Sequence, residues 1–111
     1  MPKSYKVLGQ VNPTATTAST AYTVPSSTNT IVSTISICNY GSSTASYRVA
    51  IRPNAETLAM KHYIAYDSSV PANDTINLTI GLTIDAADVV TVYASSASVS
   101  FNLFGSEIIW V

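Results

Sequence analysis

Apolar and polar residues alternate along most of the chain with a period of two. The pattern is clearest over residues 76–84, where apolar residues alternate with small or polar ones, and it recurs over 47–52 and 99–103. Successive side chains of a β-strand point to opposite faces of a sheet. The alternation therefore predicts half-buried strands, each with one face in a core and the other in water, as in antiparallel sheets.

Turn-forming segments separate the predicted strands. Residues 25–29, 39–43, 53–56, 71–74 and 95–96 contain Pro, Asn, Gly or Ser, which favour turns. The predicted strands cover 5–11, 20–24, 30–38, 45–52, 60–66, 74–84, 88–94 and 98–109. About eight short strands at this spacing predict an all-β fold, a single antiparallel β-sandwich of the jelly-roll or Greek-key-like kind.

Two segments do not fit the alternation. Residues 55–61 contain helix formers but are shorter than the roughly 12 residues that support an isolated helix, so we interpret them as a connection. Residues 11–20 are small and polar, which predicts an extended loop or arm. We therefore expect one sandwich domain over 1–111, with an N-terminal segment (1–20) able to extend from it.

The composition limits the partners that can be expected. Hydrophobic residues make up 47% of the chain and charged residues 10%, with a formal net charge of -1 and isolated Lys and Arg. No basic stripe is present to bind phosphates, so nucleic acid is not an expected partner. No apolar run approaches the roughly 20 residues that cross a bilayer, and the N-terminus lacks a secretory signal, so neither a membrane nor export is expected.

Few side chains could support catalysis. Cys38 is the only cysteine, which excludes an internal disulfide, and its place at the end of an apolar run predicts a small buried residue. His62 is the only histidine available as a catalytic base. Strand alternation would place it on the same face as Ile64 and Tyr66, which predicts a hydrogen-bonded structural histidine.

Asp85 and Asp88 could share a calcium ion or act as an acid and base pair. Their position in a short connector favours bonds to nearby backbone groups instead. The triplets at 73–75 and 77–79 fit the N-glycosylation pattern, but such triplets arise by chance in a chain rich in Asn, Ser and Thr. We expect no catalytic residue, cofactor or metal, and hence a protein that is not an enzyme.

The apolar C-terminal segment allows two interpretations. Residues 108–111 are consecutive apolar residues that include the only Trp. They could point outward as contact anchors, or they could form a last strand paired inside a sheet. Tyr40 lies in a turn before Gly41, and we predict that it is displayed at the surface.

A set of segments along nearly the whole chain carries a family resemblance: KVLGQ (6–10), AYTVP (21–25), IVST (31–34), CN followed by Gly41 (38–41), YRVAIRP (47–53), PANDT (71–75), DVVTVYA (88–94) and FNLFGSEI (101–108). In order and spacing they resemble a group of short virion structural proteins of tailed phages, including cyanophages. The chain departs from that pattern at Tyr40, where a polar or basic residue would follow Asn39, and in the apolar residues after Ile108. Both departures can alter the partner surface.

The resemblance implies a β-sandwich that attaches to the phage particle. The main hypothesis is a capsid cement or decoration protein that stabilises the head by bridging neighbouring capsid subunits. The alternative is a tail, baseplate or fibre-associated module with a structural or receptor-binding (carbohydrate-binding) role. The expected partners are the major capsid protein or other virion proteins, together with further copies of the chain in a homo-oligomer. The expected location is the virion, assembled in the host bacterial cytoplasm.

Strand edges and arms can pair with a neighbour's sheet, and many copies multiply a modest energy per contact. The two chain ends are the segments best placed for such contacts, and Tyr40 is a further candidate. The predicted contact residues are Lys3, Tyr5, Lys6, Tyr40, Ile108, Ile109, Trp110 and Val111.

Overall fold

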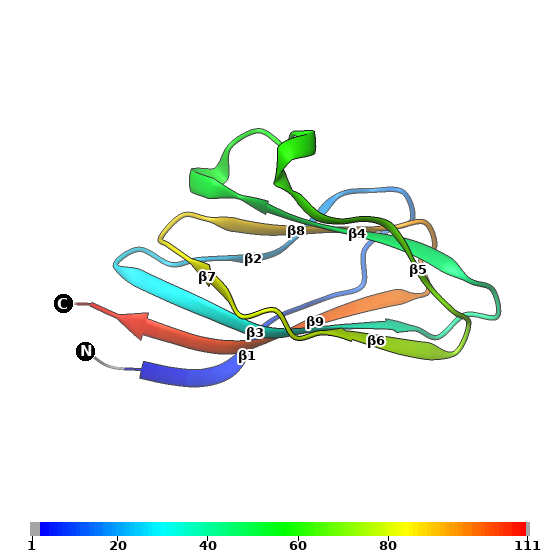
Figure 1. The fold of residues 1–111 in the computed structure, drawn as a ribbon, viewed down its shortest axis with the longest axis horizontal. Helices are drawn as coiled ribbons and strands as arrows, with labels where there is room; N and C mark the ends of the chain where they lie inside the picture. The colour runs from blue at the N-terminus through cyan, green and yellow to red at the C-terminus, as the bar shows by residue number, and fades with distance from the viewer. Residues whose placement is uncertain (1–2, 111) are drawn as a thin grey trace.

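The computed structural model describes residues 3–110, which form two packed antiparallel sheets (Figure 1). Sheet A contains β1 (Lys3–Val11), β9 (Val99–Ile109), β3 (Thr28–Asn39), β6 (Asp74–Leu78) and β7 (Leu82–Ile84). Sheet B contains β2 (Ser19–Thr23), β8 (Val89–Ala94), β4 (Ala45–Arg52) and β5 (Tyr63–Val70). The predicted all-β sandwich is confirmed.

The strand order is that of a jelly roll. Sheet A runs β1-β9-β3-β6 and sheet B runs β2-β8-β4-β5, with β7 also paired to β3. When β6 and β7 are taken as one interrupted strand, this is the order of two interlocked Greek keys, in which the chain repeatedly crosses from one sheet to the other. Because the first and last strands are neighbours, both chain ends lie at the same end of the molecule (Figure 1).

The core lies between the sheets and is built mainly from β-branched and aromatic side chains, which favour strands. The alternation predicted for 47–52 and 99–103 places its apolar residues there. The largest fully buried apolar side chains come from both sheets and include Val32, Ile35, Ile37, Val49, Val90, Val92, Val99, Phe101 and Leu103.

The predicted strand over 74–84 is divided in the structure. β6 pairs with residues 35–39 of β3, and β7 pairs with residues 30–32. Between them, Ile80 is 45% exposed and Gly81 has a φ of 59°. β3 carries a bulge between Val32 and Thr34, which changes its direction, so an uninterrupted partner strand could not follow both halves. The prediction that the alternating apolar residues over 76–84 share one buried face was therefore wrong at Ile80.

The connection predicted over 55–61 belongs to an excursion from sheet B that spans 53–62. It contains two short 3-10 helices, η1 (Pro53–Ala55) and η2 (Met60–His62), drawn above the sheet in Figure 1. β5 therefore begins at Tyr63 rather than at residue 60, and it continues to Val70. No helix within residues 3–110 is long and apolar enough to cross a membrane.

The segment predicted as a loop or arm is a short loop between β1 and β2. The Asn12 side-chain amide donates hydrogen bonds to the carbonyl oxygens of Ala97 and Val99, and the Thr16 N–H donates to Ala94. Residues 3–11 are a paired strand rather than a projecting arm. The loop interpretation is therefore correct for 12–18.

The two phenylalanines of β9 provide a direct test of this packing. Phe101 is fully buried, whereas Phe104 is 38% exposed on the outer face. We expect Phe101→Ala to lower the free energy of unfolding by about 3–5 kcal/mol, because it leaves a cavity. The matched variant Phe104→Ala should cost about 1 kcal/mol or less. Urea denaturation measures both, and equal losses would contradict the assigned register.

Candidate interaction surface

An apolar patch lies on the outer face of sheet A, at the end that holds both chain termini. Tyr5 is opposite Ser106, which is opposite Ile31 on the next strand, and Val7 is opposite Phe104. Residues directly opposite one another share a face of the sheet, so these apolar side chains lie on the same outer face and line one depression. We call Tyr5, Val7, Ile31 and Phe104 the terminal patch; Tyr5 is 78% exposed and Val7 is 48% exposed.

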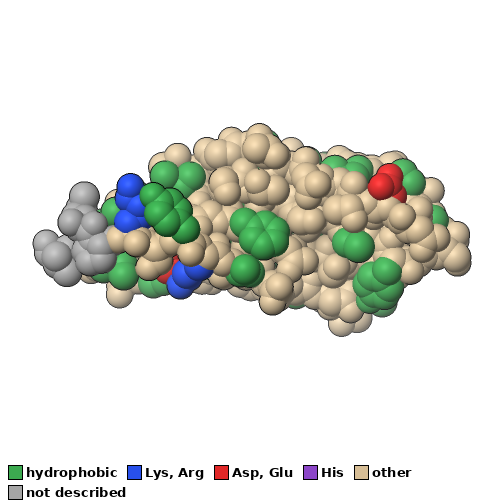
Figure 2. Space-filling model, turned by 90° about the horizontal axis from the view of Figure 1, so that it is seen from below, with side chains coloured by type: hydrophobic (Ala, Val, Ile, Leu, Met, Phe, Trp, Pro, Cys, Tyr) green, Lys and Arg blue, Asp and Glu red, His purple; other side chains and the backbone are tan. Residues whose placement is uncertain are grey.

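The terminal patch surrounds a shallow depression of about 480 Å³. Its lining also includes Lys6, Ser33, Gly105 and Ser106. A Cβ at Gly105 would lie 1.9 Å from the Ile31 carbonyl oxygen, so this close approach of β9 to β3 requires glycine. Figure 2 shows this face, with separate apolar groups on an otherwise neutral surface and Lys or Arg near the terminal end.

A polar network lies beneath the patch, between the two sheets. The Lys6 ammonium is 2.8 Å from Glu107 Oε1, and the Tyr22 hydroxyl donates to Glu107 Oε2 and lies 2.8 Å from the Thr30 hydroxyl. Burial raises the pKa of Glu107, but the hydrogen bonds from Lys6 and Tyr22 outweigh it and lower the net pKa. Burial and the Glu107 carboxylate raise the pKa of Tyr22 well above its usual value.

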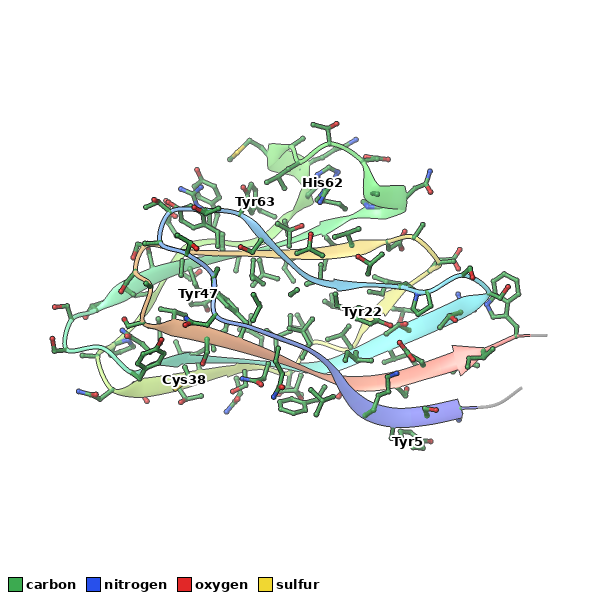
Figure 3. All side chains as sticks on the ribbon, turned by 180° about the vertical axis from the view of Figure 1, so that it is seen from behind. Tyr5, Tyr22, Cys38, Tyr47, His62 and Tyr63 are labelled. Carbon is green, nitrogen blue, oxygen red and sulfur yellow. The ribbon has the colours of Figure 1, made fainter. Side chains whose placement is uncertain are left out.

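The predicted contact residues of β1 have different surroundings. Tyr5 points away from the core (Figure 3). The exposed Lys3 ammonium lies 5.9 Å from the centroid of the Tyr5 ring, within the range of a cation–π contact. Lys6 is about half exposed, but its charge is paired with Glu107. Tyr5 is therefore the most exposed apolar side chain among the described residues of the predicted set.

The C-terminal segment combines both interpretations of the sequence. Ile108 is half-buried, and Ile109 is paired with Thr28 in β3 yet 38% exposed. The Trp110 N–H donates to the carbonyl of Ser27, while its side chain is 42% exposed. The segment is thus held by the sheet and also presents apolar surface. Val111 lies outside the described residues.

Tyr40 lies at the opposite end of β3 from the terminal patch. Its ring is 57% exposed, which confirms the predicted display. Its hydroxyl is 3.0 Å from both Asn12 Oδ1 and the Ala97 carbonyl oxygen, so the ring is held in place. The structure therefore does not bring Tyr40 together with the contact residues of the chain ends.

His62 is hydrogen-bonded within the fold, as predicted. It is buried, its Nδ1 accepts the Ala59 N–H at 3.0 Å, and its Nε2 lies 3.2 Å from Glu56 Oε1. The predicted shared face with Ile64 and Tyr66 was wrong, because both of those side chains are exposed. Residues 60–62 form a 3-10 turn, so strand alternation does not apply to them.

Cys38 is half-buried on the outer face of sheet A, opposite Ser100 on one side and Thr75 on the other. The inward positions of this part of β3 are instead Ile35, Ile37 and Asn39. The predicted burial of Cys38 in the core was therefore wrong. Its neighbours Ile37 and Asn39 point into the core, so Cys38 points outward.

Asp85 and Asp88 hold backbone turns, as predicted. Asp88 accepts the N–H groups of Asn54 at 2.9 Å and Asp85 at 2.8 Å. Asp85 Oδ1 accepts the Ala86 N–H and the Asn29 side-chain amide. Among residues 3–110, no group of three or more His, Cys, Asp or Glu side chains is placed to hold a metal ion.

Three members of the terminal patch were missed by the sequence interpretation: Val7, Ile31 and Phe104. Each has an apolar neighbour in its strand, as in the pairs 7–8, 31–32 and 103–104. In a regular strand, one member of such a pair points to the outer face. These adjacent apolar residues are the signal that could have identified the patch.

The network beneath the patch predicts a pH-dependent stability. The pKa of Glu107 is lowered by folding, so its contribution is present at neutral pH and is lost as pH falls through the folded-state pKa. We expect Glu107→Gln to cost about 1.5–3 kcal/mol at neutral pH, since bonds to a charged group are lost. The difference from the original chain should shrink below about pH 4, as measured by urea unfolding across pH. A difference that is constant with pH would contradict the assigned network.

Comparisons with known proteins give no relative: no protein-family model matches the chain, and no curated protein matches its sequence. Its function is therefore inferred from the residues, the fold and the surface.

Proposed function

We propose that this chain is a non-enzymatic structural protein of a phage virion, a capsid cement or decoration protein that bridges neighbouring capsid subunits. The main support from the structure is the terminal patch, an exposed apolar surface with Tyr5 at its edge. Large aromatic side chains are common anchors of protein interfaces, and a hollow with apolar walls can receive a partner's side chain. The sequence resemblance to virion proteins of tailed phages favours a capsid protein as that partner.

The low charge of the chain favours association through apolar contact. Only 10% of the residues are charged, and Lys6 is already paired within the molecule. Apolar burial contributes roughly 25 cal/mol per Å² and depends little on ionic strength. A patch of this kind gives modest affinity for one copy, but an array of copies on a capsid multiplies it.

The shape of the molecule suits attachment by one end. The principal extents are 47 × 27 × 20 Å, and the patch and both chain ends share one end of the long sheets (Figures 1 and 3). β1 is the outermost strand of sheet A there, so its backbone can pair with a strand of a neighbour. Such an arrangement anchors the terminal end and leaves the Tyr40 end displayed.

Imaging of particles with and without this protein tests the assignment to the capsid. The proposal expects density at repeated positions on the capsid lattice. Density confined to the tail, baseplate or fibre tips would overturn the cement function and favour the alternative role.

The terminal patch can be tested by attachment of purified variants to particles that lack the protein. We expect the double variant Tyr5→Ser, Phe104→Ser to lose affinity about 30-fold, corresponding to a loss of about 2 kcal/mol. Tyr40→Ser, at the opposite end, is the matched control and should attach normally. Sedimentation of particles with bound protein measures attachment, and urea unfolding verifies that each variant is folded. Equal attachment of both variants would contradict the assigned surface.

A further inference from the structure

A row of uncharged polar side chains crosses the outer face of sheet A beyond the terminal patch. Gln10 of β1 is opposite Asn102 of β9, which is opposite Ser36 of β3, which is opposite Asn77 of β6. Each strand thus contributes one amide or hydroxyl to the same face. We call Gln10, Asn102, Ser36 and Asn77 the amide row.

The amide row retains hydrogen-bonding groups for a ligand. Gln10 Nε2 donates to Asn102 Oδ1 at 2.7 Å, which orients both amides. This bond leaves Gln10 Oε1 as an acceptor and Asn102 Nδ2 as a donor. Within residues 3–110, the side chains of Ser36 and Asn77 form no hydrogen bond to other protein groups. The row therefore presents both donors and acceptors to a ligand.

One aromatic ring borders the row and a second lies farther along the same sheet. Phe104 is two residues from Asn102 on β9, toward the terminal end, whereas Tyr40 follows the far end of β3, beyond Cys38. Both rings are partly exposed, and the Tyr40 hydroxyl is fixed by Asn12 and Ala97. A pyranose ring presents C–H groups on its faces and hydroxyls at its rim. Aromatic faces and neutral amides together complement these two kinds of surface.

Charge selects among the possible ligands. The amide row and the adjoining Ser100, Cys38 and Thr75 carry no charge, with Asp74 only at the outer corner. A polyanion would gain no ion pair on this face, and its desolvation would not be compensated. The row crosses strands spaced about 4.8 Å apart, so it spans about 14 Å, long enough for several linked sugar rings.

We propose that this face binds a neutral oligosaccharide, laid across the strands over the amide row. The site adjoins the terminal patch at Phe104, but its amides lie outside that patch, and the site does not depend on the proposed virion function. When the terminal end is anchored, the row remains on the exposed length of the molecule. The chain would then attach to the capsid by its terminal end and to an uncharged glycan by the middle of sheet A.

Binding is tested with the purified full-length chain and immobilised neutral oligosaccharides derived from cellulose, starch, mannan and galactan. Alginate oligosaccharides serve as the anionic comparison. We expect saturable binding to at least one neutral probe, unchanged by added salt, and weaker binding to alginate. No binding to any neutral probe, or preferential salt-sensitive binding to alginate, would overturn the proposal.

Variants locate the site within sheet A. We expect Asn102→Ala and Asn77→Ala each to weaken binding about five- to tenfold, because each removes one hydrogen-bonding group. Ser69→Ala, at an exposed position of β5 in sheet B, is the matched control and should bind normally. Asn77 is exposed, so its removal leaves folding unaffected and keeps the test valid if Asn102→Ala is unstable. Normal binding by Asn77→Ala and a folded Asn102→Ala would contradict the site.

The alkylation rate of Cys38 independently reports where the sugar binds. Cys38 is the only cysteine, and it is the next residue of β3 beyond Ser36 on the same face. A saturating neutral oligosaccharide should slow its alkylation severalfold. Binding without protection would place the glycan elsewhere and overturn the site. Slower alkylation with rising protein concentration and no sugar, together with sedimentation as a dimer, would assign the face to a second copy instead. These assays use no virus particles, so their failure is distinguishable from failure of the capsid attachment test.

Discussion

The antiparallel pairing of β3 with β9 is the constraint on which the rest of the structure depends. It extends from Thr28 opposite Ile109 to Asn39 opposite Val99 and is interrupted by one irregularity, between Val32 and Thr34. β1 has a similar irregularity on the other side of β9, between Val7 and Gly9. Both bulges flank the same part of β9, and bulges of this kind increase the local twist. The core, the terminal patch and the division of β6 from β7 all follow from this register.

The alternation of residue types was sufficient to predict the sandwich because it is a local property of each strand. The predicted burial of Cys38 failed because local alternation does not determine which of two adjacent residues faces the core. The predicted burial of Ile80 failed because alternation does not show where a strand is interrupted. The terminal patch was harder to predict, since it joins Tyr5 to Phe104 across strands from opposite ends of the chain. Tyr5 was recognised as a contact candidate, but its neighbours depend on long-range register. His62 shows the opposite case, in which hydrogen bonding was predicted correctly from an incorrect local conformation.

Sheet A divides its outer face between two chemistries. The terminal end carries apolar side chains around small residues, and the remainder carries neutral amides and hydroxyls. The Lys6–Glu107 pair lies beneath the terminal end and adds little net charge to it. Hydrophobic contact and neutral hydrogen bonding respond weakly to salt, so both surfaces can work in environments of variable ionic strength. The same low charge gives little electrostatic protection against self-association.

The position of β9 between β1 and β3 also affects when the molecule can fold. Strands β1 to β8 leave the ribosome before residues 99–109. Until those residues are available, no strand joins β1 to β3 in sheet A. Pairing between segments so distant in sequence is slow compared with local structure formation. A nascent chain therefore holds the facing edges of β1 and β3 unpaired until β9 is available. Sheet A consequently closes only after β9 has been synthesised and has paired with both neighbours.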